Sequence, residues 1–443
     1  MVDNAMEGVA SWQVLSAAAI FLISYSLIVA EKINRSIVAL CGALIMVLLG
    51  IVDLHTAYEV HIHWATIFLL LGMMILVGIT NRSGIFEYIA VRTAQSAKGD
   101  PIKILIRLAI LTGVGSAFID NVTTVLLVAP ITIAIARTMR INPVPFLITQ
   151  ILICNIGGAA TLVGDPPNIM IGLAAGFTFN QFLIHITPCI IVCGIFTIFF
   201  VRHYFGKKMR INERYKDVLM ETDAKDYIRD SVLAKKSIFV FVLTIIGFLT
   251  HQYVHVEPAT VALCGAALLM LIGTKEHDLE EVYHSIEWPT VFFFGGLFVL
   301  VGGLVEVGII QSIANWMVDV TGGDIMLTSF IMLWGAGIGS AFVDNIPLVA
   351  TMIPMVHDMG AALSLSTVEL NTLWWSLALG ACLGGNGTII GSSANLIVAG
   401  IAAREGTPIT FINYLKISVP VTLITLAIAT VYVFFVYIRL GFA

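Results

Sequence analysis

Long apolar runs separated by short polar loops recur along almost the entire chain. A helix needs about 20 apolar residues to cross a bilayer, so each run predicts a crossing helix. The pattern therefore predicts an all-α polytopic membrane protein with ten crossings. The expected crossings are residues 12–30, 37–52, 64–80, 145–174 and 182–205 in the first half, and residues 237–254, 258–273, 288–303, 370–402 and 413–438 in the second half.

Two further apolar segments, residues 102–139 and 325–357, are too long for a single crossing. Each is interrupted in the middle by a polar motif, "GSAFIDN" at 115–121 and "GSAFVDN" at 339–345. A helix, a turn and a second helix fit this pattern, so each segment is expected to be a re-entrant hairpin that leaves the membrane on the side where it entered. The crossings at 145–174 and 370–402 also contain interruptions, and we expect them to be broken helices.

The two halves of the chain are copies of each other. "VALCGA" occurs at 38–43 and at 261–266, and a tryptophan opens the third span of each half, Trp64 and Trp288. The interrupted crossings also match, with "NIGGAATLVGDPPN" at 155–168 and "CLGGNGTIIGSSAN" at 382–395. Because each half contributes an odd number of crossings, residues 12–205 and 237–438 are expected to form inverted repeats. Inverted repeats with paired broken helices are typical of secondary transporters.

Composition and charge agree with this interpretation and predict an orientation. Of the 443 residues, 58% are hydrophobic and 12% are charged, and the mean hydropathy is +0.97. These values exclude a water-soluble fold, and no nucleic-acid-binding function fits them. Nine of the 23 Lys and Arg residues lie in a polar linker, residues 206–236, between the two halves.

The positive-inside rule places this linker in the cytoplasm and both termini outside. With that orientation every Lys and Arg except Arg439 falls on the cytoplasmic side. We expect a multi-pass protein of the plasma or inner membrane. The first apolar run lacks a preceding basic segment, so it is expected to stay as a span rather than to be a cleaved signal peptide.

The motif repeats and the interruptions together predict a binding site. A helix broken inside the membrane leaves backbone groups unpaired unless they are buried in protein or line a wet cavity, so such breaks indicate function. Glycine and proline unwind the first crossing and glycine alone unwinds the second. Freed carbonyls can bind a cation, and helix N-termini can hold an anion. We expect one hairpin tip near each break. The candidate binding residues are Asp120, Asn121, Thr123, Thr124, Asn155, Gly157, Gly158, Thr161, Gly164, Asp165, Pro166, Asn168, Asp344, Asn345, Gly384, Gly385, Asn386, Thr388, Gly391, Ser392 and Asn395.

The acids among these residues need a partner. An unpaired carboxylate at the centre of a bilayer costs about 2.5–3.5 kcal/mol on insertion scales, and we expect no Lys or Arg at the same depth. The carboxylates therefore need a cation, a proton or a hydrogen-bond donor, and a Na⁺ site is expected at Asp120, Asn121, Asp344 and Asn345. The alternative is that Asp120 and Asp344 only cap the hairpin helices, and both roles can coexist.

At these motifs the chain resembles the ion transporter superfamily, which includes ArsB/NhaD proteins and divalent anion/Na⁺ symporters. "DNVTT", "NIGGAAT", "GDPPN" and "GACLGGNGTIIGSSAN" are similar to the branch of the P protein and the arsenical pump membrane proteins. The resemblance covers nearly the whole chain. It implies a homodimer in which a scaffold surrounds a transport domain that moves as an elevator, with hairpin tips and broken helices holding substrate and ions.

The chain differs from the dicarboxylate symporters of this superfamily, whose hairpin tips read Ser-Asn-Thr. Here the tips read Asp120, Asn121, Val122 and Asp344, Asn345, Ile346. The asparagines match the sodium sites of the family, whereas the hydroxyl groups that contact a dicarboxylate are missing. The added carboxylates favour cation or proton handling. Asp165 has no acidic counterpart in the second half, where Ser392 and Ser393 stand, so the two sites are not expected to be equivalent.

The leading functional prediction is Na⁺- or H⁺-coupled secondary transport of a small anion or oxyanion, such as arsenite or a carboxylate. The alternatives are a Na⁺/H⁺ antiporter without another substrate and an anion channel. We predict no enzymatic activity and no cofactor beyond the coupling ion. No ATP-binding loop occurs, so energy comes from gradients or from a separate ATPase subunit.

Two minor features have simpler explanations. His61 and His63 lie in a short loop without an evident third ligand, and we interpret them as solvated histidines rather than a metal site. The six cysteines lie within apolar runs and are expected to be small buried residues, although Cys154 and Cys382 lie close enough to the breaks to meet a thiophilic substrate.

Overall fold

The computed structural model describes residues 10–30, 32–206, 220–275 and 278–443. Within these residues the protein is helical and contains no strand, so the all-α prediction is confirmed. Ten of the helices are long and apolar enough to cross a membrane, in agreement with a multi-pass membrane protein. The expectations for residues 1–9 and for residues 207–219 of the linker lie outside the described residues.

The first half contains helices that correspond to the expected spans, hairpin and broken crossing. They are α1 (Ser11–Ala30), α2 (Arg35–Leu48), α3 (Leu54–Thr56), the π-helical turn η2 (Ala57–His61), α4 (Trp64–Arg82), α5 (Ile85–Ser96), α6 (Pro101–Phe118), α7 (Asn121–Thr138), α8 (Val144–Gly158), α9 (Pro166–Ala175), α10 (Phe179–His185) and α11 (Thr187–Gly206).

The second half repeats this order after a short connecting helix. Its elements are η3 (Ala224–Tyr227), α13 (Ser231–Thr250), α14 (Pro258–Gly273), α15 (Leu279–His284), α16 (Trp288–Glu306), α17 (Ile309–Thr321), α18 (Ile325–Phe342), α19 (Asn345–Leu363), α20 (Thr367–Gly384), η5 (Ile389–Gly391), α21 (Ser393–Arg404), α22 (Phe411–Tyr432) and η6 (Val433–Arg439).

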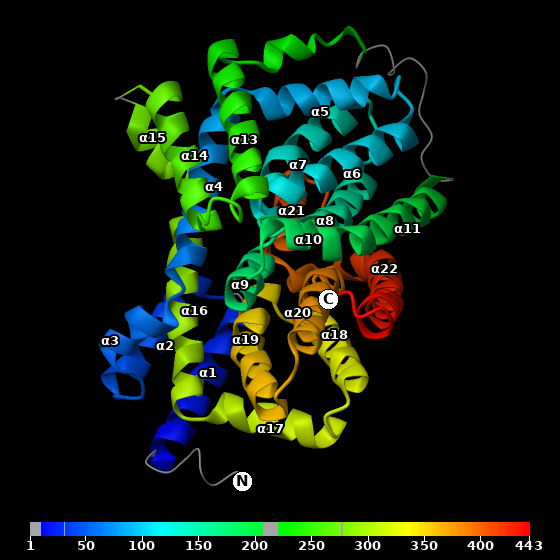
Figure 1. Ribbon diagram of the computed structural model, residues 1–443. Coiled ribbons are helices and arrows are strands. Elements are labelled where there is room, and N and C mark those ends of the chain that lie inside the picture. Colours follow the sequence, from blue (N-terminus) through cyan, green and yellow to red (C-terminus); the bar gives the residue numbers. More distant parts are fainter. Residues whose placement is uncertain (1–9, 31, 207–219, 276–277) are drawn as a thin grey trace.

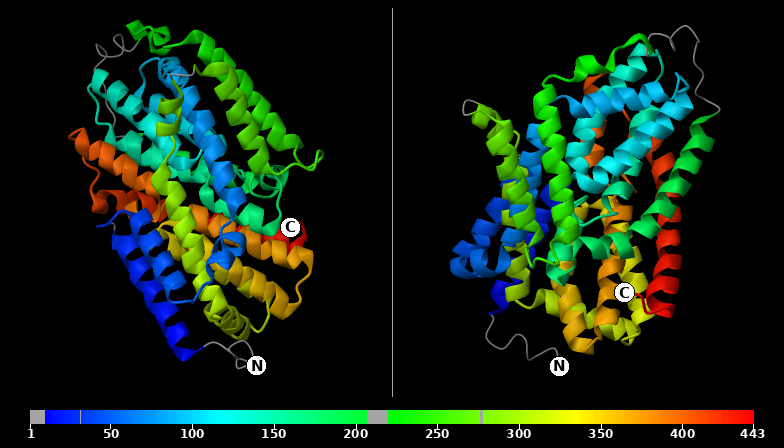
Figure 2. Two further views of the ribbon diagram at one scale, coloured as in Figure 1. Left: turned by 90° about the vertical axis from the view of Figure 1, so that its left-hand side faces the viewer. Right: turned by 45° about the horizontal axis from the view of Figure 1, so that its top comes forward.

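The helices form two groups. Helices α1, α2, α4, α13, α14 and α16 make a lateral bundle, in which α2 packs on α16 and α14 packs on α4. In Figure 2, α1 and α2 lie at one end of this bundle, and α13 and α14 lie at the other. Helices α6–α11 and α18–α22 make a second group, which we call the site bundle. The amphipathic helices α5 and α17 connect the two groups and lie across opposite ends of the molecule in Figure 1.

The two hairpins enter the site bundle from opposite ends (Figure 1). Hairpin α6–α7 and hairpin α18–α19 point their tips toward the middle, where the breaks between α8 and α9 and between α20 and α21 lie. The repeats also interlock, because α9 packs against α19 and α21 packs against α7. The second part of each broken helix therefore contacts the hairpin of the other half, and this arrangement matches the predicted inverted repeats.

Some details differ from expectation. The ten long apolar helices include the four hairpin arms, whereas α2 and α14 are shorter than a full span and the broken crossings consist of two helices each. Helix α13 begins at Ser231 rather than at the expected Ser237, because the Asp230 carboxylate accepts the N–H groups of Val232 and Leu233 and caps the helix there. Among the cysteines, Cys41 and Cys264 are exposed on the protein surface and not buried as expected.

Candidate functional site

The hairpin tips are built by two aspartates that begin a helix. Asp120 is the N-cap of α7 and accepts the backbone N–H of Thr123 at 3.0 Å as well as the Thr123 hydroxyl. Asp344 is the N-cap of α19 and accepts the backbone N–H of Ile346 at 3.2 Å. Both carboxylates thus satisfy helix N–H groups, which is the capping role considered as an alternative from the sequence. Thr124, one position further, donates its hydroxyl to the Ile119 carbonyl at 3.2 Å.

Matching asparagines hold the two breaks in shape. The amide of Asn168 donates to the carbonyls of Ala159 at 3.0 Å and Thr161 at 2.9 Å. The amide of Asn395 donates to the carbonyls of Gly385 at 2.8 Å and Thr388 at 3.0 Å. These carbonyls are released by the end of the preceding helix, and the amide satisfies them inside the protein.

Two threonines attach the breaks to the hairpins in the same repeated way. The Thr161 hydroxyl donates to the carbonyl of Ala117, and the Thr388 hydroxyl donates to the carbonyl of Ala341. Both carbonyls lie just before a hairpin tip. Each break and the hairpin of its own half therefore form one hydrogen-bonded unit.

The glycines serve close packing more than unwinding. A Cβ atom on Gly157 would lie 2.2 Å from the carbonyl oxygen of Gly113 in α6, and one on Gly384 would lie 2.2 Å from that of Gly337 in α18. Neither glycine has a positive φ. The same holds for the other candidate glycines of the breaks, Gly158, Gly164, Gly385 and Gly391. A side chain at Gly157 or Gly384 would force the hairpin arm away from the broken helix.

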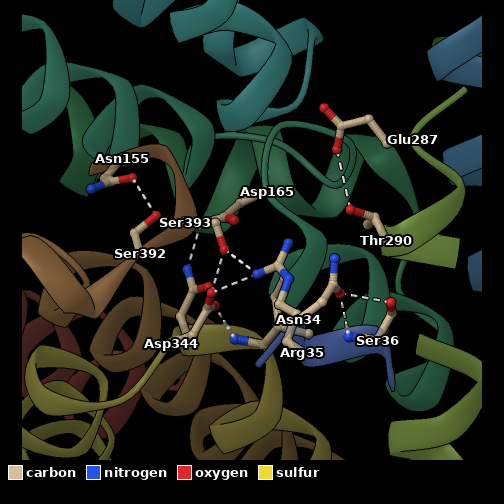
Figure 3. Close-up of polar contacts among 12 residues, drawn as sticks. Asn34, Arg35, Ser36, Asn155, Asp165, Glu287, Thr290, Asp344, Ser392 and Ser393 are labelled. Atoms are coloured by element: carbon tan, nitrogen blue, oxygen red, sulfur yellow. Dashed lines mark hydrogen bonds and ion pairs between the residues drawn. The ribbon is translucent and has the colours of Figure 1, made fainter. Parts of the chain in front are cut away.

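The two breaks meet in one polar cluster. The Asn155 amide of α8 donates to the side-chain oxygens of Asn386 at 2.9 Å and Asn395 at 2.8 Å. The Asn155 oxygen accepts the Ser392 hydroxyl at 3.2 Å (Figure 3) and the Asn121 amide at 3.3 Å. We expected one hairpin tip near each break, and Asn155 in addition connects the first tip directly to the second break. The site is therefore shared by both halves.

Asp165 lies between the two hairpin tips. Its carboxylate accepts the amide of Asn345 at 3.2 Å, and the side chains of Asn121 and Cys382 approach it as well. The residue is 2% exposed. No Lys, Arg or His forms an ion pair with Asp165 among the residues that the structure describes. A buried carboxylate held only by neutral donors can accept a proton or a cation.

Asp344 has a different environment, because the expectation that no Lys or Arg reaches the acids is wrong. The Arg35 guanidinium lies 3.0 Å from the Asp344 carboxylate, and the Ser393 hydroxyl also contacts both groups (Figure 3). Arg35 belongs to the first turn of α2 in the lateral bundle, far from Asp344 in sequence. Sequence reasoning missed it because Arg35 follows a polar loop, where a solvated cation is the ordinary interpretation.

Glu287 adds a further acid from the lateral bundle. It precedes α16, and one of its carboxylate oxygens accepts the Thr290 hydroxyl at 3.1 Å (Figure 3). Burial raises the pKa of Glu287, and the negative charge of Asp120 raises it further, whereas Thr290 and Arg35 act in the opposite direction. The site region thus contains four carboxylates and one guanidinium among the described residues: Asp120, Asp165, Glu287, Asp344 and Arg35.

The helix N-termini at the breaks are not equivalent toward an anion. Asp120 and Asp344 already cap α7 and α19. Helix α9 begins with Pro166 and Pro167, which carry no N–H group. Helix α21 begins at Ser393, beside Arg35, without a side-chain cap. Its first turn is therefore the N-terminus that best suits a negative charge.

His61 and the two cysteines near the breaks, Cys154 and Cys382, have partners within the protein. The Nε2 atom of His61 bonds to the Glu306 carboxylate at 3.0 Å, so this histidine is not simply solvated as expected. No group of three or more metal-ligating side chains occurs in the part of the chain that the structure describes. Cys154 donates to the Ser116 hydroxyl at 3.3 Å, and Cys382 donates to the Asn168 oxygen at 3.4 Å, so both thiols are buried members of the hydrogen-bonded framework.

Proteins with similar sequences include named transporters. An uncharacterized transporter of Mycobacterium tuberculosis is 41% identical over 95% of this chain and 98% of its own length. The 46 kDa membrane protein of Mycobacterium leprae is 40% identical over 95% of this chain and 98% of its own length. The P protein of Mus musculus is 30% identical over 97% of this chain, and the chain spans 61% of that longer protein.

A solved structure shares the fold. The YdaH transporter of Alcanivorax borkumensis is similar with a TM-score of 0.57 and 12% identity, over 97% of this chain and 98% of that one. The family model described as citrate transporter, CitMHS, matches residues 25–380. These matches confirm the superfamily resemblance and a transporter rather than an enzyme. The family model covers most of the chain, including both hairpins, the first break and most of the helices around the shared polar cluster. The chain therefore belongs to the CitMHS citrate transporter family.

Proposed function

We propose that this membrane transporter carries a small anion and couples its movement to Na⁺ or H⁺. The single observation that supports this best is Asp165, a buried carboxylate that both hairpin tips contact and that no cationic side chain pairs with among the described residues. A carboxylate in such a place needs a mobile cation or a proton. The carriers of the family model are described as citrate transporters, which agrees with an anionic substrate.

The coupling ion is proposed to bind on the Asp165 side of the cluster. Carboxylate and amide oxygens are ligands that hard cations prefer, and the side chains of Asn121 and Asn345 approach Asp165 from the two tips. The asparagine-held carbonyls of the breaks keep a second lone pair each, which is available for further ligation. Binding of the cation would remove the negative charge that otherwise repels an incoming anion.

Movement is proposed to follow the elevator scheme implied by the superfamily. The site bundle contains both hairpins and both breaks, whereas the lateral bundle touches the cluster mainly through Arg35 and Glu287. A sliding motion of one bundle along the other would carry Asp165 and the hydrogen-bonded cluster around Asn155 without dismantling them, whereas Arg35 and Glu287 would stay with the lateral bundle. A homodimer, in which the lateral bundles of two copies meet, is the assembly that the resemblance suggests.

A second candidate function is Na⁺/H⁺ antiport without another substrate. The excess of carboxylates in the site region favours it, because four acids and one guanidinium attract cations more than anions. Exchange of Na⁺ for H⁺ at Asp165 would then be the whole transport cycle.

Purified protein in liposomes distinguishes the two functions. Uptake of labelled citrate, other carboxylates, phosphate and arsenite is measured under imposed Na⁺ or H⁺ gradients, with internal pH recorded in parallel. Anion uptake that follows the gradient is expected, and Asp165→Asn should remove the gradient dependence. Asp319 is an exposed aspartate of α17, so Asp319→Asn removes the same charge at the surface and serves as the control. Na⁺/H⁺ exchange without any anion uptake would replace the leading function by the second one.

A further inference from the structure

Arg35 occupies a position that helix energetics does not favour. It is the first residue of α2, whose N-cap Asn34 accepts the N–H and the hydroxyl of Ser36 (Figure 3). The N-terminus of a helix carries partial positive charge, so a cation in the first turn weakens the helix. The unfavourable placement needs a compensating contact, and the structure supplies contacts from α16, from the N-cap of α19 and from the first residue of α21.

Those contacts hold the guanidinium in one orientation. Its central carbon lies 4.9 Å from the centroid of the buried Phe293 ring of α16, in a cation–π contact. One terminal nitrogen, Nη1, donates to Asp344 at 3.0 Å and also contacts the hydroxyl of Ser393. The side chain is 27% exposed, whereas Asp344 is 13% exposed. Arg35 is therefore fixed through Nη1, and its side chain remains partly exposed.

The second edge of the guanidinium has unused donors. An arginine carries five N–H groups in a planar fork. Within the described residues, Nη2 and Nε donate no hydrogen bond, and Figure 3 shows the other terminal nitrogen pointing away from Asp344. Two parallel N–H groups on one edge match the two oxygens of a carboxylate or of a phosphate-like oxyanion.

We propose that Arg35 is the anion-recognition residue of this transporter and that it binds a carboxylate or tetrahedral oxyanion through its Nη2–Nε edge. This inference rests on the proposed anion transport and adds the residue that selects the substrate class. Asp344 is a positioning residue, because it orients Arg35 and does not itself receive the anion. The uncapped first turn of α21 beside Ser393 adds a favourable potential. Arsenite, which is an uncharged acid at neutral pH, gains little from this arrangement.

The consequence is a division of the site by charge. The anion would bind between Arg35 of the lateral bundle and the α21 N-terminus of the site bundle, and the coupling cation would bind at Asp165. Asp165 and Asp344 lie close enough for their charges to interact. A cation at Asp165 therefore also lowers the electrostatic cost of an anion at Arg35.

Variants at the ion pair test the proposal in the full-length protein. Uptake kinetics in liposomes and binding to purified protein, followed by thermal shift, are measured with citrate, succinate and phosphate. Arg35→Gln is expected to raise the KM and the dissociation constant Kd by about ten- to a hundred-fold, the usual effect of losing hydrogen bonds to a charged group. Arg35→Lys keeps the charge but not the fork, so it should also raise the KM. Lys32→Gln, an exposed charge loss in the same loop, should leave the KM unchanged.

The double variant separates recognition from a structural ion pair. If Arg35 binds the anion, Arg35→Gln with Asp344→Asn should be as impaired as Arg35→Gln alone. Restored uptake in the double variant would overturn the proposal, since two neutral residues would then suffice. An unchanged KM in Arg35→Gln would overturn it as well. Proton-coupled Na⁺ exchange with no anion uptake or binding by the unmodified protein would instead refute the proposed function on which it rests.

Discussion

At the residue scale, the two repeated pairs of asparagines perform different tasks. Asn168 and Asn395 donate both amide hydrogens to carbonyls of their own break, so their side chains hold the backbone. Asn121 and Asn345 project from the hairpin tips toward Asn155 and Asp165. The first pair therefore belongs to the framework, whereas the second pair faces the place where an ion would bind.

Alanine substitutions separate these two tasks. Asn121→Ala and Asn345→Ala are expected to reduce transport to background while the protein remains folded. The groups lost face Asp165 and Asn155, and the Ser116 hydroxyl, which also bonds to Asn121, keeps the Cys154 carbonyl as an acceptor. Asn168→Ala leaves two buried carbonyls unpaired, at about 1–3 kcal/mol each, and should lower the thermal stability. Uptake in liposomes and melting temperature in detergent are measured for all three variants. Full uptake in both hairpin variants would remove the tips from the mechanism.

The sequence predicted the residue types at the site better than their partners. Repetition of the Asp-Asn motif identified the tips, because polar residues inside an apolar segment need a function. The repeated motif did not identify Arg35. The contact of Arg35 with Asp344 joins α2 to the start of α19, and no local sequence pattern encodes a contact between such distant segments. The one available signal was a cation at the first turn of a helix, against the helix dipole.

At the element scale, the hairpin arms and broken helices approach each other at glycines. Gly157 faces Gly113, and Gly384 faces Gly337, at corresponding positions of the two halves. The sequence indicated that glycine marks the breaks, but it could not distinguish an unwound helix from a close backbone contact. That distinction depends on which helix packs against which, and so on tertiary structure.

A methyl group at this contact tests its importance. In Gly384→Ala the new Cβ would lie 2.2 Å from the Gly337 oxygen, so α18 and α20 must separate and the second break must shift. We expect a lower melting temperature and loss of transport. Gly335 lies in α18, and a Cβ atom added there would have no other atom within 4 Å. Gly335→Ala should therefore be neutral or slightly stabilising, because alanine favours a helix by about 1 kcal/mol over glycine. Equal behaviour of the two variants would contradict the packing argument.

At the scale of the whole molecule, the two bundles differ in what they contribute. The site bundle holds every candidate binding residue predicted from the sequence, and the lateral bundle adds Arg35 and Glu287. The repeat could be recognised from the sequence because its motifs lie at matching positions. The interlock of α9 with α19 and of α21 with α7 could not, because each contact joins elements of opposite halves.

The proposed sliding of the bundles predicts that a link between them stops transport. Asn180 of α10 donates to the Leu249 carbonyl of α13 at 2.9 Å, so these positions lie together across the two bundles. Asn180→Cys with Leu249→Cys, in a background of Cys41→Ser and Cys264→Ser, is treated with a short cleavable thiol cross-linker and assayed in liposomes. Uptake should fall to background and return when the linker is cleaved, since the site bundle is then free to move.

The matched control is a link inside the lateral bundle. The Nε2 atom of His61 lies 3.0 Å from the Oε1 atom of Glu306. Glu306 ends α16 of that bundle and His61 ends η2, which packs on α16, so His61→Cys with Glu306→Cys should tolerate the same cross-linker. A complete link between Asn180→Cys and Leu249→Cys that leaves uptake intact would mean that substrate crosses without relative motion of the bundles. In that case movements of the hairpin tips alone, around Asp165 and Arg35, would have to open the site to each side in turn.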